Sequence, residues 1–275
     1  MVMAKDNPRP LVMGIVNVTP DSFSDGGHHA APDQAIAHAH ALIRAGADIL
    51  DIGGESTRPG AKAVSVQEEM DRVMPVVQRL VGKTSIPISI DTRRPEIAQA
   101  SIEAGAQIWN DVSALRTSPN SLQTAADLNV PVVLMHMRGE PGTMQDNPHY
   151  TDVVSEVITF LRERVHAAMA AGVRQKNIII DPGIGFGKRL KDNLALMQAL
   201  GRITQETGQR LLFGASRKRF IEGLDPGAAP DDRLGGSLAS ALWAAQERVD
   251  IIRVHDVKET VQALHVWHAI NDAAP

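Results

Sequence analysis

The stretch NIIIDPGIGFGKR, residues 177–189, decides which fold the sequence predicts. Three isoleucines lead into Asp181, and a proline and three alternate glycines follow at once. A strand that is apolar on both faces is typical of a parallel sheet covered by helices. Asp181 at its end either caps the next turn, as Asp often does before Pro, or binds a ligand at a cavity mouth. Other strands that end in polar side chains would favour the second interpretation.

The same order of apolar strand, polar loop and helix recurs along the chain. The strands are expected at residues 11–18, 49–52, 86–90, 107–109, 131–135, 178–181, 211–213 and 251–254. Apolar residues at helical spacing predict helices between them, among them 66–80, 121–128, a longest one at 152–171, and 191–207. Eight such units predict an α/β protein, a single (β/α)8 TIM barrel in one domain over residues 1–275. A doubly wound open sheet is the alternative, but it usually needs fewer units.

Composition restricts the class of partner. The chain has 275 residues, 43% of them hydrophobic and 22% charged, which is ordinary for a globular protein with a core. A net charge of -4 with interspersed signs offers no basic face for nucleic acid and no polybasic run for a membrane. Cysteine is absent, so thiolate metal sites, disulfides and cysteine nucleophiles are excluded. No 18 apolar residues run together, and we expect a cytoplasmic enzyme that acts on small molecules.

Polar residues follow nearly every expected strand. In a barrel the carboxyl ends of the strands meet at one mouth, where barrel enzymes place their chemistry. The residues expected there are Asn17, the loop 55–58, Asp91, Asn110, His136, Asp181, Lys218, Arg253 and His255. Each also has a structural explanation: Asn110 ends a strand, Arg253 pairs with a barrel carboxylate, and His255 is a satisfied structural histidine. Together these explanations weaken, because a purely structural barrel has no need for polar groups around one rim.

The residue types suggest a substrate with two different parts. Asp91, Asn110 and Asp181 offer acceptors and an amide suited to the N–H edge of a flat heterocycle. Arg253 and His255 suit phosphate oxygens, and the amide oxygen of Asn17 is a hard ligand suited to Mg²⁺. We therefore expect a flat polar head and a phosphate tail.

Common catalytic motifs do not fit. The glycines of DPGIGFG are spaced G-x-G-x-G, which is not the dinucleotide motif, and GFGKR lacks the spacing and the Ser or Thr of a P-loop. The sequence has no HExxH motif and no serine-hydrolase arrangement.

Two long glycine-rich loops, TPDSFSDGGHH at 19–29 and GGESTRPGAK at 53–62, have the composition of mobile lids. The first contains Asp21 and Phe23. An exposed loop aromatic is more often incidental, but Phe23 could also stack on a planar substrate.

Eight segments together resemble the bacterial dihydropteroate synthase family over nearly the whole chain. They are MGIVNVTPDSFSDGG (13–27), DIGGESTRPGA (51–61), SIDT (89–92), NDVSAL (110–115), LMHMRGEPGTMQ (134–145), IIIDPGIGFGK (178–188), FGASRKRF (213–220) and RVHDV (253–257).

The resemblance implies a barrel enzyme that joins 6-hydroxymethyl-7,8-dihydropterin diphosphate to 4-aminobenzoate, with Mg²⁺, as a homodimer. The implied pterin pocket comprises Asp91, Asn110, Met135, Asp181, Gly214, Lys218 and Arg253. The implied diphosphate and Mg²⁺ site comprises Asn17, Arg253 and His255, and the implied aminobenzoate site comprises Thr57, Arg58, Pro59, Phe186 and Lys218. Asp91, Lys218, Arg253 and His255 would carry the catalysis.

Two alternatives share part of the pattern. A non-catalytic pterin-binding paralogue would show a broken motif, and none is broken. A barrel that transfers a methyl group from methyltetrahydrofolate would need neither the diphosphate site nor the STRPG loop. One position departs from the family: Arg219 stands where some members have Ser, which leaves the contacts of that position open.

Overall fold

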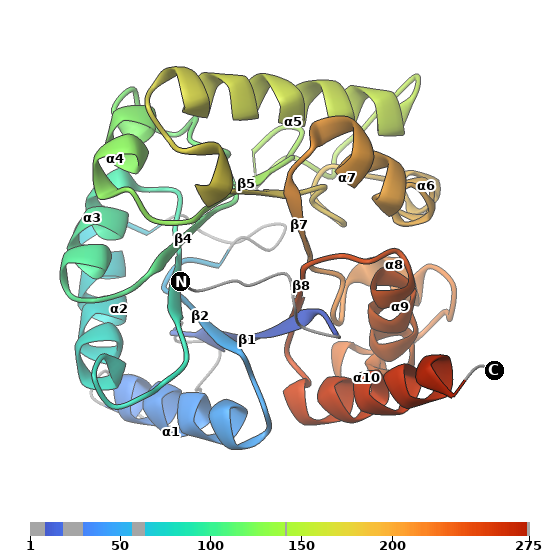
Figure 1. Ribbon diagram of the computed structural model, residues 1–275, viewed down its shortest axis with the longest axis horizontal. Helices are drawn as coiled ribbons and strands as arrows, with labels where there is room; N and C mark the ends of the chain where they lie inside the picture. Colours follow the sequence, from blue (N-terminus) through green and yellow to red (C-terminus); the bar gives the residue numbers. More distant parts are fainter. Residues whose placement is uncertain (1–8, 19–29, 57–63, 141, 274–275) are drawn as a thin grey trace.

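Eight parallel strands close into a barrel in sequence order, with helices around the outside (Figure 1). The computed structural model describes residues 9–18, 30–56, 64–140 and 142–273. The strands are β1 (Leu11–Asn17), β2 (Ile49–Gly53), β3 (Ile88–Asp91), β4 (Ile108–Asp111), β5 (Val132–Met135), β6 (Ile178–Asp181), β7 (Arg210–Phe213) and β8 (Ile251–Val254). Strand β1 pairs with β8 as well as with β2, which closes the barrel. The predicted (β/α)8 architecture is confirmed, and the open sheet is excluded.

The helices follow the strands as expected, with one difference. They are α1 (Ala30–Arg44), α2 (Val66–Leu80), α3 (Pro95–Glu103), α4 (Ser121–Leu128), α5 (Val153–Ala170), α6 (Leu190–Gln198), α7 (Leu200–Thr207), α8 (Arg219–Glu222), α9 (Leu234–Gln246) and α10 (Val257–Asp272). The single helix predicted over 191–207 is wrong. Two helices, α6 and α7, occupy that range and meet at Ala199, whose ψ of 11° departs from helical geometry.

The helix ends explain why the other boundaries were predictable. Ser65 caps α2 by accepting a hydrogen bond from the backbone N–H of Glu68 at 3.1 Å. Asp152 caps α5 in the same way, with acceptor distances of 3.1 Å to two backbone N–H groups. Gly208 ends α7 in a left-handed conformation, with φ of 65°. These are the capping residue types that mark helix ends in a sequence.

Side chains alternate between the two faces of each strand. Those pointing outward pack against the helices and form the main core, for example Leu50, Ile90, Trp109 and Ile180. Those pointing inward at the amino-terminal end fill the barrel with one apolar layer: Met13, Ile49, Ile108, Val133, Ile179, Leu212 and Ile251. The inward positions nearer the carboxyl ends hold the polar residues described below.

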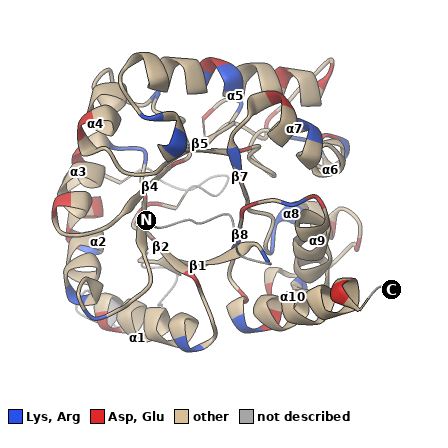
Figure 2. Ribbon diagram, viewed as in Figure 1, with Lys and Arg blue, Asp and Glu red and all other residues tan. Residues whose placement is uncertain are grey.

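The outer surface carries charges of both signs, distributed around the helices in the view of Figure 2. Within the described parts of the chain, no helix combines the length and the apolar character needed to cross a membrane.

Candidate active site

The strands bring most of the predicted site residues to one end of the barrel. Inward positions at the carboxyl ends hold Asn17, Asp91, Asn110, Met135 and Asp181, and Arg253 lies in β8. Gly214, Lys218 and His255 follow β7 and β8, and Phe186 lies in the loop after β6. Asp21, Phe23, Thr57, Arg58 and Pro59 were also predicted, but they lie outside the described residues.

Arg253 forms the centre of the site by bridging two carboxylates. Its Nε donates to Asp51 Oδ2 and its Nη2 donates to Asp91 Oδ2, both at 2.6 Å. The Asp51 side chain is fully buried, and those of Asp91 and Arg253 are 13% and 21% exposed. The structural explanation for Arg253 was that it pairs with a barrel carboxylate, and this contact is confirmed. Two carboxylates on one guanidinium nevertheless leave an excess negative charge at the mouth.

Burial and the neighbouring charges shift the pKa values of this group. Burial raises the pKa of Asp91 to about 7, because the Arg253 charge offsets only part of the desolvation and Asp51 adds repulsion. Burial disfavours the charged form of Arg253, but Asp51 and Asp91 outweigh it and raise the pKa of the guanidinium. Arg253 is thus permanently charged, while Asp91 can take up a proton near neutral pH.

Asp51 is a site residue that the motif analysis missed. Besides Arg253, its Oδ2 accepts a hydrogen bond from Asn110 Nδ2 at 3.0 Å. This bond fixes the amide, so that the Asn110 oxygen is left for another partner. Asp51 Oδ1 and the neighbouring Ser89 Oγ are buried without a hydrogen-bond partner among the described residues. An acidic residue in the middle of the apolar strand ILDIG was the signal that could have revealed it.

Asp181 caps a turn and also faces the site. Its Oδ1 accepts a hydrogen bond from the Gly183 backbone N–H at 2.7 Å, so the turn-cap interpretation is correct as far as it goes. Burial raises the pKa of Asp181, and the nearby Lys218 charge opposes that shift. Burial likewise lowers the pKa of Lys218 to about 8, against the attraction of Asp181. The turn-cap interpretation is therefore confirmed, and ligand binding by Asp181 stays a prediction.

The glycines after Asp181 are required by the path of the backbone. Gly183 and Gly187 have φ of 66° and 62°, in the left-handed region that residues other than glycine rarely adopt. A Cβ atom at position 183 would lie 2.0 Å from the His136 carbonyl oxygen, and one at 187 would lie 2.3 Å from that of Arg138. The loop after β6 therefore packs directly on the backbone that follows β5.

An apolar wall lies beside the polar groups. Met135 is buried with Val112, Met137 and Met144, and Phe186 packs against this cluster. The Phe186 ring centroid is 4.6 Å from Lys218 Nζ, a cation–π distance. An apolar wall beside a row of acceptors fits a flat ring that has a polar edge.

His255 directly follows β8 and Asn17 ends β1, and these two strands are neighbours in the barrel. His255 Nδ1 is 3.0 Å from Ser216 Oγ, and its backbone N–H donates to the same oxygen at 3.2 Å. Asn17 ends β1 and is half-buried. In the described part of the chain, no cluster of three or more His, Cys, Asp or Glu side chains could hold a metal ion.

His136 was expected at the mouth, and this prediction is wrong. It follows the inward Met135, so its side chain points outward, where its ring meets Phe160 of α5 edge-on with centroids 4.8 Å apart. Burial, reinforced by the charge of Lys188, lowers the pKa of His136 to about 2. The ring is neutral and structural. The Arg219 side chain is 77% exposed, and it lies 3.9 Å from Glu222.

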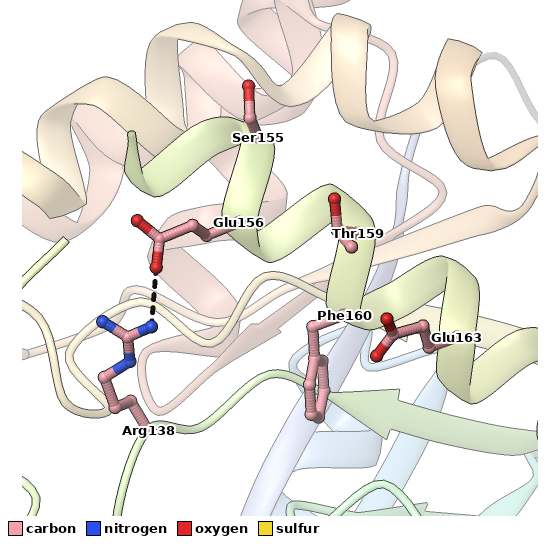
Figure 3. Close-up of a pocket in the computed structure, with 6 residues that line it drawn as sticks. All are labelled: Arg138, Ser155, Glu156, Thr159, Phe160 and Glu163. Carbon is pink, nitrogen blue, oxygen red and sulfur yellow. Dashed lines mark hydrogen bonds and ion pairs between the residues drawn. The ribbon is translucent and has the colours of Figure 1, made fainter. Parts of the chain in front are cut away.

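A separate hollow lies on the outer side of this region, between α5 and the loop after β5 (Figure 3). Its volume is about 330 Å³, and the Arg138–Glu156 ion pair, at 2.6 Å, closes one side of it. None of the predicted site residues lines it.

Comparisons with known proteins agree with this geometry. Residues 13–255 match the family model described as a pterin binding enzyme. The chain is 48% identical over 264 residues to the dihydropteroate synthase of Escherichia coli strain K12, covering 96% of this chain and 93% of the relative. It is 45% identical over 262 residues to that of Bacillus subtilis strain 168, covering 95% and 89%.

Solved structures give the same result. A Xanthomonas albilineans dihydropteroate synthase with 4-aminobenzoic acid has a TM-score of 0.91 and 54% identity, covering 97% of this chain and 94% of that one. A structure of the enzyme from the same organism in complex with 7,8-dihydropteroate has a TM-score of 0.88 and 50% identity, covering 97% and 95%. The chain belongs to the dihydropteroate synthase family of pterin-binding enzymes.

Proposed function

We propose that this chain condenses 6-hydroxymethyl-7,8-dihydropterin diphosphate with 4-aminobenzoate, giving 7,8-dihydropteroate and diphosphate for folate synthesis. The observation that carries the proposal is the Asp51–Arg253–Asp91 bridge at the mouth of a barrel of this family. It is supported by relatives, matched over nearly their whole length, whose structures contain 4-aminobenzoic acid or 7,8-dihydropteroate.

In this proposal the pterin head binds against Asp91, Asn110 and Asp181. A carboxylate can accept the paired N–H donors on the edge of a pterin, and the amide oxygen of Asn110 is left for a further donor. Met135 and the apolar cluster around it would contact the ring face. Gly214 lies beside these groups, since a Cβ there would make ordinary contacts, 3.8 Å from the Arg253 Cβ and 3.9 Å from Lys218 Nζ.

The chemistry needs charge stabilisation and no protein nucleophile. The methylene–oxygen bond breaks with its electron pair on diphosphate, and the arylamine nitrogen then bonds to the methylene carbon and loses a proton. Asp91, when ionised, faces the cation that develops on the pterin, and a fixed carboxylate in a dry site can supply much of the rate. Arg253 uses Nε and Nη2 for its carboxylates, which leaves Nη1 for a phosphate oxygen beside His255.

Phe186 and Lys218 form the described part of the proposed aminobenzoate site. The Lys218 ammonium could pair with the carboxylate of 4-aminobenzoate, and the Phe186 ring could contact its aromatic face. Thr57, Arg58 and Pro59, the other predicted residues of this site, stay predictions.

Mg²⁺ is proposed as the metal ion, held by the amide oxygen of Asn17. A single protein oxygen is enough for Mg²⁺, which usually keeps several waters and takes its remaining ligands from substrate phosphates. The lack of a carboxylate cluster among the described residues fits such an ion better than one bound by a protein cage. When bound, it would neutralise charge on the leaving diphosphate. Excess EDTA should suppress turnover and added Mg²⁺ should restore it, whereas full activity in EDTA would contradict this role.

We also propose a homodimer, working in the cytoplasm as the sequence predicts. A groove of about 560 Å³ lies between α6, α8 and α9, and its lining is largely apolar. Leu224 and Trp243 in this groove are 58% and 45% exposed, an arrangement typical of an interaction surface. Light scattering should give the mass of two chains, and Leu224→Glu should halve it. A wild type that is monomeric at micromolar concentration would disprove the dimer.

The decisive experiment is a turnover assay with both substrates. Formation of dihydropteroate separates the synthase from a non-catalytic pterin-binding protein and from a methyltransferase. Tight binding of the pterin diphosphate without product would instead support the non-catalytic alternative.

A further inference from the structure

Lys188 is a buried lysine that forms no hydrogen bond with a carboxylate of the described residues. Lys188 is only 3% exposed, and it directly follows Gly187, the last glycine of the loop. Nζ contacts the carbonyl oxygens of Gly183 at 2.8 Å, Phe186 at 3.0 Å and His136 at 3.2 Å. It also lies 2.9 Å from His136 Nδ1. All of the partners recorded for it in the described chain are therefore neutral.

This environment differs from that of two arginines, the half-buried Arg253 and the buried Arg233. Arg253 is paired with two carboxylates, and the buried Arg233 is paired with Glu222 at 2.6 Å. Removing an ammonium group from water is costly unless other groups replace its hydration. Carbonyl dipoles do so here, much as they surround a bound metal ion. Burial lowers the pKa of Lys188 well below its ordinary value, although the Asp181 charge opposes the shift.

The carbonyl groups that Lys188 binds belong to two segments. Gly183 and Phe186 form one turn, in which the Phe186 backbone N–H donates to the Gly183 oxygen at 3.1 Å. His136 directly follows β5. The ammonium therefore ties the turn that carries Phe186 to the end of the neighbouring strand.

The opposite side of the same turn faces the site. The Ile184 carbonyl accepts a hydrogen bond from Lys218 Nζ at 2.6 Å, and the Phe186 ring lies over the same ammonium. The turn is thus held between two lysines, one in the site and one behind it. A shift of the turn would move the Phe186 ring and the Lys218 ammonium together.

We propose that Lys188 is a positioning residue for the arylamine side of the site: its ammonium holds the Gly183–Phe186 turn, and thereby Phe186 and Lys218, in the binding geometry. The inference rests on the proposed synthase function for the identity of the ligand. Lys188 lies behind the turn and makes no contact with substrate in this arrangement.

Other side chains hold different parts of the loop, which limits the expected effect. Gln145 Nε2 donates to the Gly185 oxygen at 2.5 Å, and Tyr150 Oη donates to the Gly187 oxygen at 2.8 Å. Asn193 Oδ1 accepts from the Gly185 N–H at 2.7 Å. Loss of Lys188 should therefore loosen the carbonyl groups of Gly183 and Phe186, while Gly185 within the turn and Gly187 after it stay attached.

The first test compares Lys188→Met with Lys191→Met, an exposed lysine three residues away. Methionine keeps the unbranched shape but cannot donate hydrogen bonds. We expect KM for 4-aminobenzoate to rise about tenfold or more in Lys188→Met, because a small misplacement of binding groups weakens productive binding. Affinity for the pterin diphosphate, measured by calorimetry, should change much less. Equal losses for both substrates, or no loss, would overturn the proposal.

Chemical rescue separates the ammonium from general packing. The chain has no cysteine, so Lys188→Cys introduces a single thiol. Alkylation of the unfolded variant with 2-bromoethylamine, followed by refolding, restores an ammonium of nearly the lysine length. Iodoacetamide gives a neutral side chain as the matched control. The aminoethylated protein should recover KM for 4-aminobenzoate and the control should not; equal behaviour of the two would disprove the role of the charge.

Hydrogen exchange tests whether Lys188 holds the Gly183–Phe186 turn, and it does so without relying on turnover. The Phe186 amide should exchange about tenfold faster or more in Lys188→Met than in the wild type and Lys191→Met, because local opening becomes easier. Unchanged exchange at this amide would overturn the proposal even if the enzyme is active. Faster exchange in a protein without synthase activity would overturn the proposed function, but the inference that Lys188 holds the turn would stand.

Discussion

The two ends of the barrel interior differ in composition although the same strands build them. The amino-terminal end is one layer of seven apolar side chains, including Ile179 and Ile251. Two residues further along β6 and β8, the inward positions are Asp181 and Arg253. The apolar layer contributes stability through burial, whereas the polar end keeps charges in positions that burial alone disfavours. One strand can therefore be divided into a part that stabilises the fold and a part that we propose binds the substrate.

The largest expected effect comes from Asp181→Asn at the polar end. The amide oxygen can still accept the Gly183 N–H, but its NH₂ group replaces an acceptor that the substrate needs. We expect kcat/KM to fall on the order of 10²–10³-fold, as for other buried charge-assisted contacts at active sites. The free energy of unfolding should change little, because burial already disfavours the Asp181 charge. Calorimetry that shows unchanged affinity for the pterin diphosphate would refute the assignment.

The apolar end should give the opposite result. Ile179→Ala, two residues before Asp181, removes buried methyl and methylene groups from a fully buried position. The free energy of unfolding in urea should drop by about 2–5 kcal/mol. At a temperature where the variant is folded, kcat/KM should stay close to the wild-type value. If activity fell as far as in Asp181→Asn, the division of the strand into two parts would be wrong.

A smaller effect is expected from the titration of Asp91. Its pKa is raised by burial to about 7, so the folded protein binds this proton more tightly than the unfolded chain. Its contribution to stability is therefore full at low pH and is lost as the pH rises from about 4 to about 7. Asp111 and Asp181 shift in the same direction, so a comparison with a variant is needed.

Asp91→Asn supplies that comparison. The free energy of unfolding in urea should be measured for both proteins at pH 5 and at pH 7.5. On going from pH 5 to pH 7.5, it should fall more in the wild type than in Asp91→Asn, by on the order of 1 kcal/mol. A variant with the same pH dependence as the wild type would show that Asp91 keeps an ordinary pKa beside Arg253.

The smallest effect is predicted for Arg219→Ala. The Arg219 side chain points to solvent, and its nearest carboxylate, that of Glu222, is 3.9 Å away. We expect the free energy of unfolding to change by less than about 0.5 kcal/mol, as at other exposed positions, with KM for 4-aminobenzoate nearly unchanged. A clear rise in this KM would mean that Arg219 turns inward when the substrate binds.

The sequence predicted the fold and the rim because both depend on local patterns. Apolar runs ended by polar residues located every strand, and the residues of β8 were predicted without error. What the sequence left open was the face on which a residue lies. Strands buried on both sides are apolar throughout. The four residues of β5, VVLM, therefore do not indicate which side chains point into the barrel and which point toward the helices.

His136 and Asp51 show the consequence of this ambiguity. His136 was assigned to the mouth because it follows a strand, yet alternation after the inward Met135 turns it outward. Asp51 was passed over because it lies within a strand, although it shares the inward face with Ile49. The proposed role of Lys188 depends on contacts with a distant segment, which no local pattern records.

The excess negative charge beneath the mouth has a consequence for inhibitor design. Compounds that place two adjacent N–H donors on a neutral or weakly basic flat ring should complement Asp181 and Asp91, while acidic rings should be repelled by them. The Asp51–Arg253–Asp91 bridge is already formed within the protein, so such a compound need not reorganise it on binding. The affinity of compounds that bind Asp181 and Asp91 should therefore depend on the basicity of the ring more than on its size.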